Sequence, residues 1–216
     1  MGKVLIFKDA DFSQNAIDGD KDYVLADSIT FDGSHYINIG RGLTQQSKVE
    51  ICFTPTTAAT GSQIIALAGV RTAALYNMLD FRIIYDKGRN LLAVNMQNDG
   101  QAAGGAVNIN ISINSKHTLV ADIKNNTVVF DDTVQPQNVH TVTGFNTGSN
   151  NLYIGAYNSG GSIPSAFTWF IGDIHWIKIY DNETLSNYFH AATIKVDGTP
   201  CLVDRLNDAN KYYFVS

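Results

Sequence analysis

Charged side chains are scarce in this sequence of 216 residues. Asp, Glu, Lys and Arg together make up 16% of the chain, and the formal net charge is −5 at pH 7. A protein that binds nucleic acid needs a basic surface to neutralise phosphates, so this charge balance argues against a nucleic-acid partner. The abundant uncharged polar residues suit turns and contacts with neutral partners such as sugars or other protein subunits.

Cysteine is also rare, because Cys52 and Cys201 are the only two. Two lone cysteines in a chain of this length do not make a disulfide framework. Cys52 lies inside an alternating, strand-like run. We therefore favour two buried or half-buried free thiols, with a disulfide bond as the alternative.

Long hydrophobic runs are missing. No stretch approaches the roughly 20 apolar residues of a membrane-spanning helix. The apolar residues 4–7 are too few for the core of a signal peptide, and Lys8 and Asp9 follow them directly. We expect that the protein is made in a cytoplasm and does not insert into a membrane. The alternative is that the Met-Gly start replaces a native signal peptide.

Apolar and polar residues alternate in several segments of the chain. It recurs in residues 48–53, 81–86 and 117–123, with turn pairs such as Asp32-Gly33 and Asn125-Asn126 between such runs. Short strands with regular turns predict one all-β domain over residues 1–216, an antiparallel two-sheet β-sandwich of the jelly-roll type. Residues 1–27 are expected to form an N-terminal arm or an edge strand.

Two local features carry further predictions. In residues 172–180, Ile174 is out of phase with Ile177 and Ile179, so an extra residue near His175–Trp176 is needed to bring all three isoleucines to the core. We predict a β-bulge there. Residues 185–192 are expected to form a short helix, capped by Asp181 or Asn182.

Several segments carry a family resemblance. Residues 151–180 contain LYIGA and then FIGDIHWIKIY, residues 31–40 read FDGSHYINIG, and residues 117–133 read HTLVADIKNNTVVFDDT. Together they resemble laminin-G-like modules of the concanavalin A-like lectin and glucanase superfamily. The tail, residues 189–214, and the opening DADFS are similar to such modules in bacteriophage tail and other virion proteins.

The resemblance implies a recognition scaffold. It suggests a non-catalytic bacteriophage virion module in a tail, a fibre or a capsid decoration. The implied partners are other virion proteins, further copies of the same chain and host-surface glycans, and the implied location is the virion. A bacterial lectin-like carbohydrate-binding protein or a glycoside hydrolase of the same fold is the alternative, and a purely structural adhesion domain is a third reading.

Catalytic chemistry finds little support. Glycosidases of this fold resemble one another in an E-x-D-x-x-E strand, and this chain has only Glu50 and Glu183, in separate segments. There is no G-x-S-x-G motif, and the histidines are dispersed. We predict no catalytic residue, no metal ligand and no cofactor, and thus no enzyme. Aspartates converging from different strands, and a calcium ion bound by aspartates, stay open.

Sugar binding would use aromatic faces beside amides that bond hydroxyl groups. The ligand-binding candidates are therefore aromatic and amide residues in or near turns: Tyr76, Asn77, Tyr157, Asn158 and Trp169. Each has packing as its alternative role, above all Trp169, which lies within a hydrophobic run.

Overall fold

The computed structural model describes residues 21–56, 63–71, 78–86, 89–97, 107–136, 144–163, 167–207 and 209–215. Their regular structure is entirely β-strand. No helix among these residues is long and apolar enough to cross a bilayer. The predicted all-β class is confirmed.

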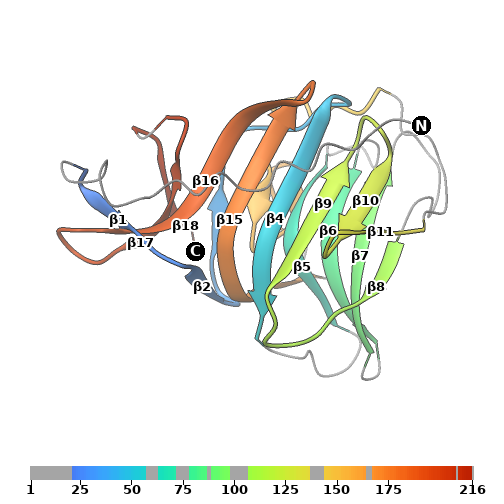
Figure 1. Ribbon diagram of the computed structural model, residues 1–216, viewed down its shortest axis with the longest axis horizontal. Coiled ribbons are helices and arrows are strands. Elements are labelled where there is room, and N and C mark those ends of the chain that lie inside the picture. The colour runs from blue at the N-terminus through green and yellow to red at the C-terminus, as the bar shows by residue number, and fades with distance from the viewer. Residues whose placement is uncertain are drawn as a thin grey trace.

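The strands form two layers that enclose the hydrophobic core, with one layer in front of the other in Figure 1. The first sheet contains β1 Tyr23–Leu25, β2 Ile29–Asp32, β4 Ser47–Pro55, β9 His117–Asp122, β10 Thr127–Phe130, β11 Thr133–Val134, β15 Ile171–Asp181, β16 Thr184–Ile194 and β17 Pro200–Asp204. The second contains β3 Tyr36–Asn38, β5 Gln63–Arg71, β6 Met78–Asp86, β7 Arg89–Gln97, β8 Val107–Asn110, β12 Tyr153–Ile154, β13 Asn158–Ser159 and β14 Phe167–Trp169.

Neighbouring strands are mostly antiparallel. The first sheet runs β17–β16–β15–β4–β9–β10–β11, and β1 and β2 pair with the ends of β16 and β15. The second runs β3–β12–β5–β6–β7–β8, and β13 and β14 lie parallel to β5. Strand β18 (Lys211–Val215) pairs with β17 through its first three residues and with β3 through its last two, so it joins the two sheets. This arrangement is a β-sandwich.

The core follows the alternation seen in the sequence. Leu119, Ala121 and Ile123 on and after β9 are fully buried, whereas Thr118 and Val120 between them are only partly buried. Phe53 and Phe170 meet edge-on in the same core with ring centroids 6.3 Å apart. Burying a side chain of this size contributes about 2–3 kcal/mol.

The predicted β-bulge in β15 is confirmed. The register of β15 against β4 shifts between Ile174 and Trp176. As a result Ile174, Ile177 and Ile179 are all fully buried. A strand without the extra residue would turn the last two isoleucines to the outer face.

The predicted helix at residues 185–192 is wrong, because these residues belong to strand β16. Asn182 and Glu183 both have left-handed backbone angles, with φ of 48° and 64°, and they join β15 directly to β16. Two consecutive left-handed residues make the tight turn that matches the twist of a hairpin. Asp181 does not cap a helix, because its carboxylate accepts bonds from Arg41 and Ser47.

Both cysteines are free and buried, as predicted. Burial raises the pKa of the Cys201 thiol to about 11 and also raises that of Cys52. Neither thiol is therefore a ready nucleophile at neutral pH.

Candidate functional site

Three aromatic residues from separate strands meet on the outer face of the second sheet. They are Tyr36 on β3, Tyr153 on β12 and Trp169 on β14, and we call them the aromatic platform. Ile37 and Ile154 are register partners and both lie in the core. Because successive side chains on a strand point to opposite faces, Tyr36 and Tyr153 point outward.

The platform rings are in direct contact. Tyr36 stacks on Tyr153 with centroids 4.5 Å apart, and Trp169 meets Tyr36 edge-on at 5.8 Å. Tyr153 is 8% exposed, whereas Tyr36 and Trp169 keep part of their surface open to solvent. Burial raises the pKa of Tyr153, and the neighbouring Tyr36 adds to the rise. The phenol therefore stays protonated and can donate a hydrogen bond.

A polar turn precedes Tyr36. Asp32 Oδ1 accepts hydrogen bonds from the backbone N–H of Ser34 at 2.9 Å and from its hydroxyl at 2.6 Å, and His35 Nδ1 lies 3.1 Å away. These bonds lower the pKa of Asp32 to about 2, so this exposed carboxylate is anionic at neutral pH. A Cβ on Gly33 would lie 3.9 Å from the Trp169 carbonyl oxygen, which places the turn next to β14.

Trp169 is the one predicted ligand-binding residue that lies in this platform. Tyr157 and Asn158 are 1% and 2% exposed. Asn158 closes its turn by donating from Nδ2 to the Asn151 carbonyl at 2.7 Å and by accepting at Oδ1 from the Gly161 N–H at 2.7 Å. Both side chains are thus occupied with packing or turn geometry. Tyr76 and Asn77 lie outside the described residues.

Tyr157 packs across Gly69 of β5, where an added Cβ would come within 3.1 Å of ring atom Cε2. The Arg71 guanidinium lies over this ring, 5.5 Å from its centroid. Arg71 Nε also donates to Ser159 Oγ at 2.7 Å. Tyr157 and Ser159 therefore fix the direction of the Arg71 side chain at one end of β5.

The outer face of the first sheet carries a second group of aromatic residues. Lys178 Nζ lies 4.6 Å from the ring centroid of Trp176 and 5.1 Å from that of Tyr188. Lys48 Nζ lies 4.1 Å from the centroid of the Tyr180 ring. Because these lysines already occupy ring faces that a sugar would need, this surface is the weaker candidate for stacking.

The structure brings the two glutamates to one lysine. Lys48 Nζ lies 3.9 Å from Glu50 and 3.7 Å from Glu183. The ammonium group of Lys48 therefore lies within ion-pair distance of both carboxylates. Within the described residues, no group of three His, Cys, Asp or Glu side chains could hold a metal ion.

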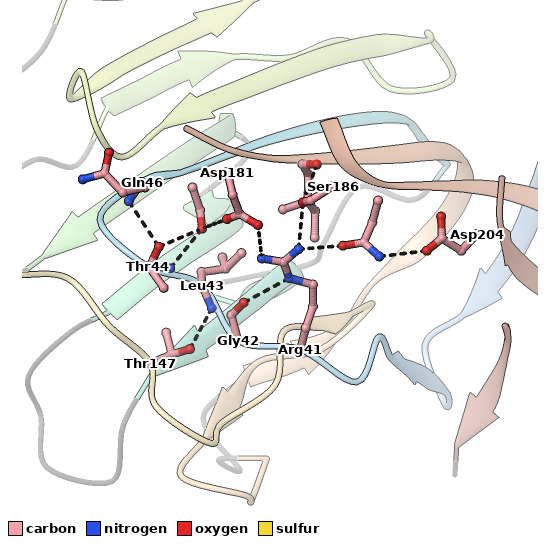
Figure 2. A network of polar contacts seen from close by, with 12 residues as sticks. Arg41, Gly42, Leu43, Thr44, Gln46, Thr147, Asp181, Ser186 and Asp204 are labelled. Carbon is pink, nitrogen blue, oxygen red and sulfur yellow. Dashed lines mark hydrogen bonds and ion pairs between the residues drawn. The ribbon is translucent and has the colours of Figure 1, made fainter. Parts of the chain in front are cut away.

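Arg41, which precedes β4, is the centre of a polar network (Figure 2). Its guanidinium donates to Ser186 Oγ at 2.8 Å, Asn187 Oδ1 at 2.6 Å and Asp181 Oδ2 at 2.8 Å. Asn187 in turn donates to Asp204 Oδ2 at 2.8 Å, and Asp204 is 2% exposed. All of these groups are paired with one another, so the network ties strands together and offers no open ligand site.

Solved structures share this fold at low sequence identity. The CBM40 domain of the Ruminococcus gnavus IT-sialidase, bound to α2,3-sialyllactose, aligns with a TM-score of 0.51 and 13% identity over 73% of this chain and 91% of the domain. A heptameric SAP-like pentraxin from Limulus polyphemus aligns with a TM-score of 0.50 and 12% identity over 74% of this chain and 77% of its own. No protein-family model and no curated protein matches the sequence.

Two further alignments have TM-scores below 0.5. Mouse laminin α1 domains LG4-5 give a TM-score of 0.48 with 17% identity over 76% of this chain and 44% of theirs. The tailspike protein 2 of bacteriophage CBA120 gives 0.46 with 8% identity over 74% of this chain and 28% of its own. Neither score carries an argument by itself. The topology and the two stronger alignments show the fold alone: a β-sandwich like those of the CBM40 domain and the pentraxin.

Proposed function

We propose that this protein is a carbohydrate-binding module and that the aromatic platform is its sugar-binding surface. The observation that carries the proposal is the contact between Tyr36, Tyr153 and Trp169, with Tyr36 and Trp169 partly exposed. The partly exposed rings of Tyr36 and Trp169 present apolar surface to the C–H face of a sugar. The tyrosine hydroxyls and the turn at residues 32–35 supply polar groups for sugar hydroxyls.

The comparison adds support at the level of the fold. The CBM40 domain with a TM-score of 0.51 was solved with a sialylated oligosaccharide. A shared fold does not transfer a site, so the residues proposed here rest on the geometry of this chain alone.

We also propose that the module is non-catalytic and belongs to a bacteriophage virion as a self-associating component of a tail, fibre or capsid decoration. The non-catalytic part is supported by Lys48, which pairs with Glu50 and Glu183. The virion part is supported by the sequence resemblance of residues 189–214 and of the opening DADFS. Flanking genes for portal, capsid and tail proteins are the expected genomic context, and a context without virion genes would contradict it.

Replacing Trp169 tests the platform. Trp169→Ala should weaken glycan binding about tenfold or more, because it removes an aromatic contact surface while Tyr36 and Tyr153 stay in place. Binding is measured on a glycan array and then by calorimetry with the best glycan. Trp176→Ala on the opposite face is the matched control and should bind as the unmodified protein does.

Two results would overturn these proposals. Equal binding by Trp169→Ala and the unmodified protein would remove the platform from the site. Release of shorter saccharides from the bound glycan would show that the protein is a hydrolase, the alternative that the sequence left open.

A further inference from the structure

Arg71 stands next to the aromatic platform on the same sheet. Gly69, two residues before Arg71 on β5, is the register partner of Tyr153. Residues two apart on a strand point to the same face and lie about 7 Å apart, and neighbouring strands are about 4.8 Å apart. Arg71 and Tyr153 are therefore within the span of a disaccharide or trisaccharide.

The Arg71 guanidinium is held in place, and no carboxylate of the described side chains neutralises it. Its Nε donates to Ser159 Oγ, and its Cζ lies over the Tyr157 ring. Among the described side chains, no carboxylate forms an ion pair with it. Arg41 shows the contrast, since that guanidinium donates to an aspartate, an asparagine, a serine and a backbone carbonyl.

We propose that the ligand is an acidic saccharide whose anionic group pairs with Arg71 while its rings lie on the aromatic platform. This inference rests on the function proposed above. A guanidinium presents two parallel N–H groups that match the two oxygens of a carboxylate or a sulfate. Because Nε is bonded to Ser159, the proposed pairing uses the Nη1 and Nη2 groups.

The partial burial of Arg71 strengthens the case. The side chain is half-buried, so a charge brought to it is screened less than at a fully exposed lysine. The Arg71 guanidinium is partly desolvated and is held by the Tyr157 ring and the Ser159 hydroxyl. No carboxylate of the described side chains pairs with it, so it is suited to bind an oxyanion.

The experiment compares matched glycans. The array carries pairs that differ in one feature, a uronic acid against its methyl ester and a sulfated sugar against its desulfated form. The unmodified protein should bind the acidic member of at least one pair about tenfold more tightly than its neutral member. Which pair responds tells a carboxylate ligand from a sulfate ligand.

Variants then assign the charge to Arg71. Arg71→Gln should lose about tenfold to a hundredfold in affinity for the acidic member, the range for a charge-assisted hydrogen bond, and keep its affinity for the neutral member. Unchanged binding of the neutral member also shows that the variant is folded. Lys116→Gln, which removes an exposed positive charge elsewhere, is the matched control and should bind both as before.

The outcomes separate the two proposals. Equal binding of acidic and neutral members by the unmodified protein, lost in Trp169→Ala, would overturn the acidic ligand and leave the platform standing. An acidic preference that survives in Arg71→Gln would overturn the role of Arg71. Binding of no glycan on the array would overturn both proposals.

Discussion

At the scale of single residues, glycines decide where the two sheets and their turns can approach. Gly172 at the head of β15 has φ of 150°, and a Cβ there would meet the Thr54 carbonyl oxygen and lie 2.7 Å from the Phe170 ring. The neighbouring strand and a core ring therefore leave no room for a side chain. Gly198 also has a positive φ, of 74°, but nothing lies within 4 Å of its would-be Cβ.

The two glycines give a matched pair of variants. Gly172→Ala should destabilise the protein by roughly 3 kcal/mol or more, because backbone strain and a clash with backbone atoms add together. Gly198→Ala should cost only about 1 kcal/mol, since it carries the conformational penalty alone. Urea unfolding measures both, and similar losses in the two variants would show that crowding at Gly172 is absent.

Only one of the three residues of the aromatic platform could be predicted from the sequence. The sequence indicates Trp169 as a ligand-binding candidate, because it is an aromatic residue near a turn. It does not indicate Tyr36 or Tyr153, because β3, β12 and β14 become adjacent only through the register of the folded sheet. The residues around Tyr36 do not predict that Tyr153 stacks on it. Tyr157 and Asn158 were named from a turn motif, and the structure shows both side chains buried.

At the scale of strands and turns, local pattern predicted the sandwich and the bulge but failed at β16. Residues 185–192 have apolar residues at both helical and strand spacings, so periodicity could not decide between them. The decisive feature is the Asn182–Glu183 turn, whose left-handed backbone pairs Asp181 with Thr184 and sends the chain straight back along β15. Asn favours the left-handed conformation, so Asn182 was the residue that could have indicated a turn instead of a helix cap.

The polar network around Arg41 links β15 and β16, and we predict that it stabilises the fold. Burial alone would raise the pKa of Asp181, but the hydrogen bond and charge of Arg41 outweigh it and hold the pKa below its ordinary value. Arg41→Ala should destabilise the protein by about 2 kcal/mol, because Asp181 Oδ2 and Asn187 Oδ1 each lose the hydrogen bond that Arg41 donates. A double-mutant cycle with Asp181→Asn should give a coupling of about 0.5–1 kcal/mol, since both side chains are partly exposed. Strictly additive losses would mean that the pair adds no stability.

At the scale of the whole molecule, two histidines link stability to pH. Burial lowers the pKa of His175 and of His190. His175 Nδ1 donates to the Asp27 carbonyl at 2.7 Å, which fixes the tautomer in which Nε2 accepts from the Thr54 hydroxyl at 3.0 Å. The folded state therefore favours neutral rings. The unfolded chain takes up protons near the ordinary pKa of about 6.5, so stability should fall as pH drops from about 7 to about 5.

Thermal unfolding between pH 8 and pH 5 measures this dependence. The midpoint temperature of the unmodified protein should decline below about pH 7. A His175→Gln, His190→Gln variant should show a flatter profile, whatever its absolute stability. An unchanged slope in that variant would assign the decline to other groups.

Strand β18 has a consequence for how the chain is made. Residues 211–213 complete the first layer and residues 214–215 complete the second, and β1 and β2 near the other end pair with β16 and β15. Contacts between such distant segments make folding slow. A nascent chain on the ribosome cannot close its sandwich until residues 211–215 have emerged, so folding finishes after synthesis has passed this strand.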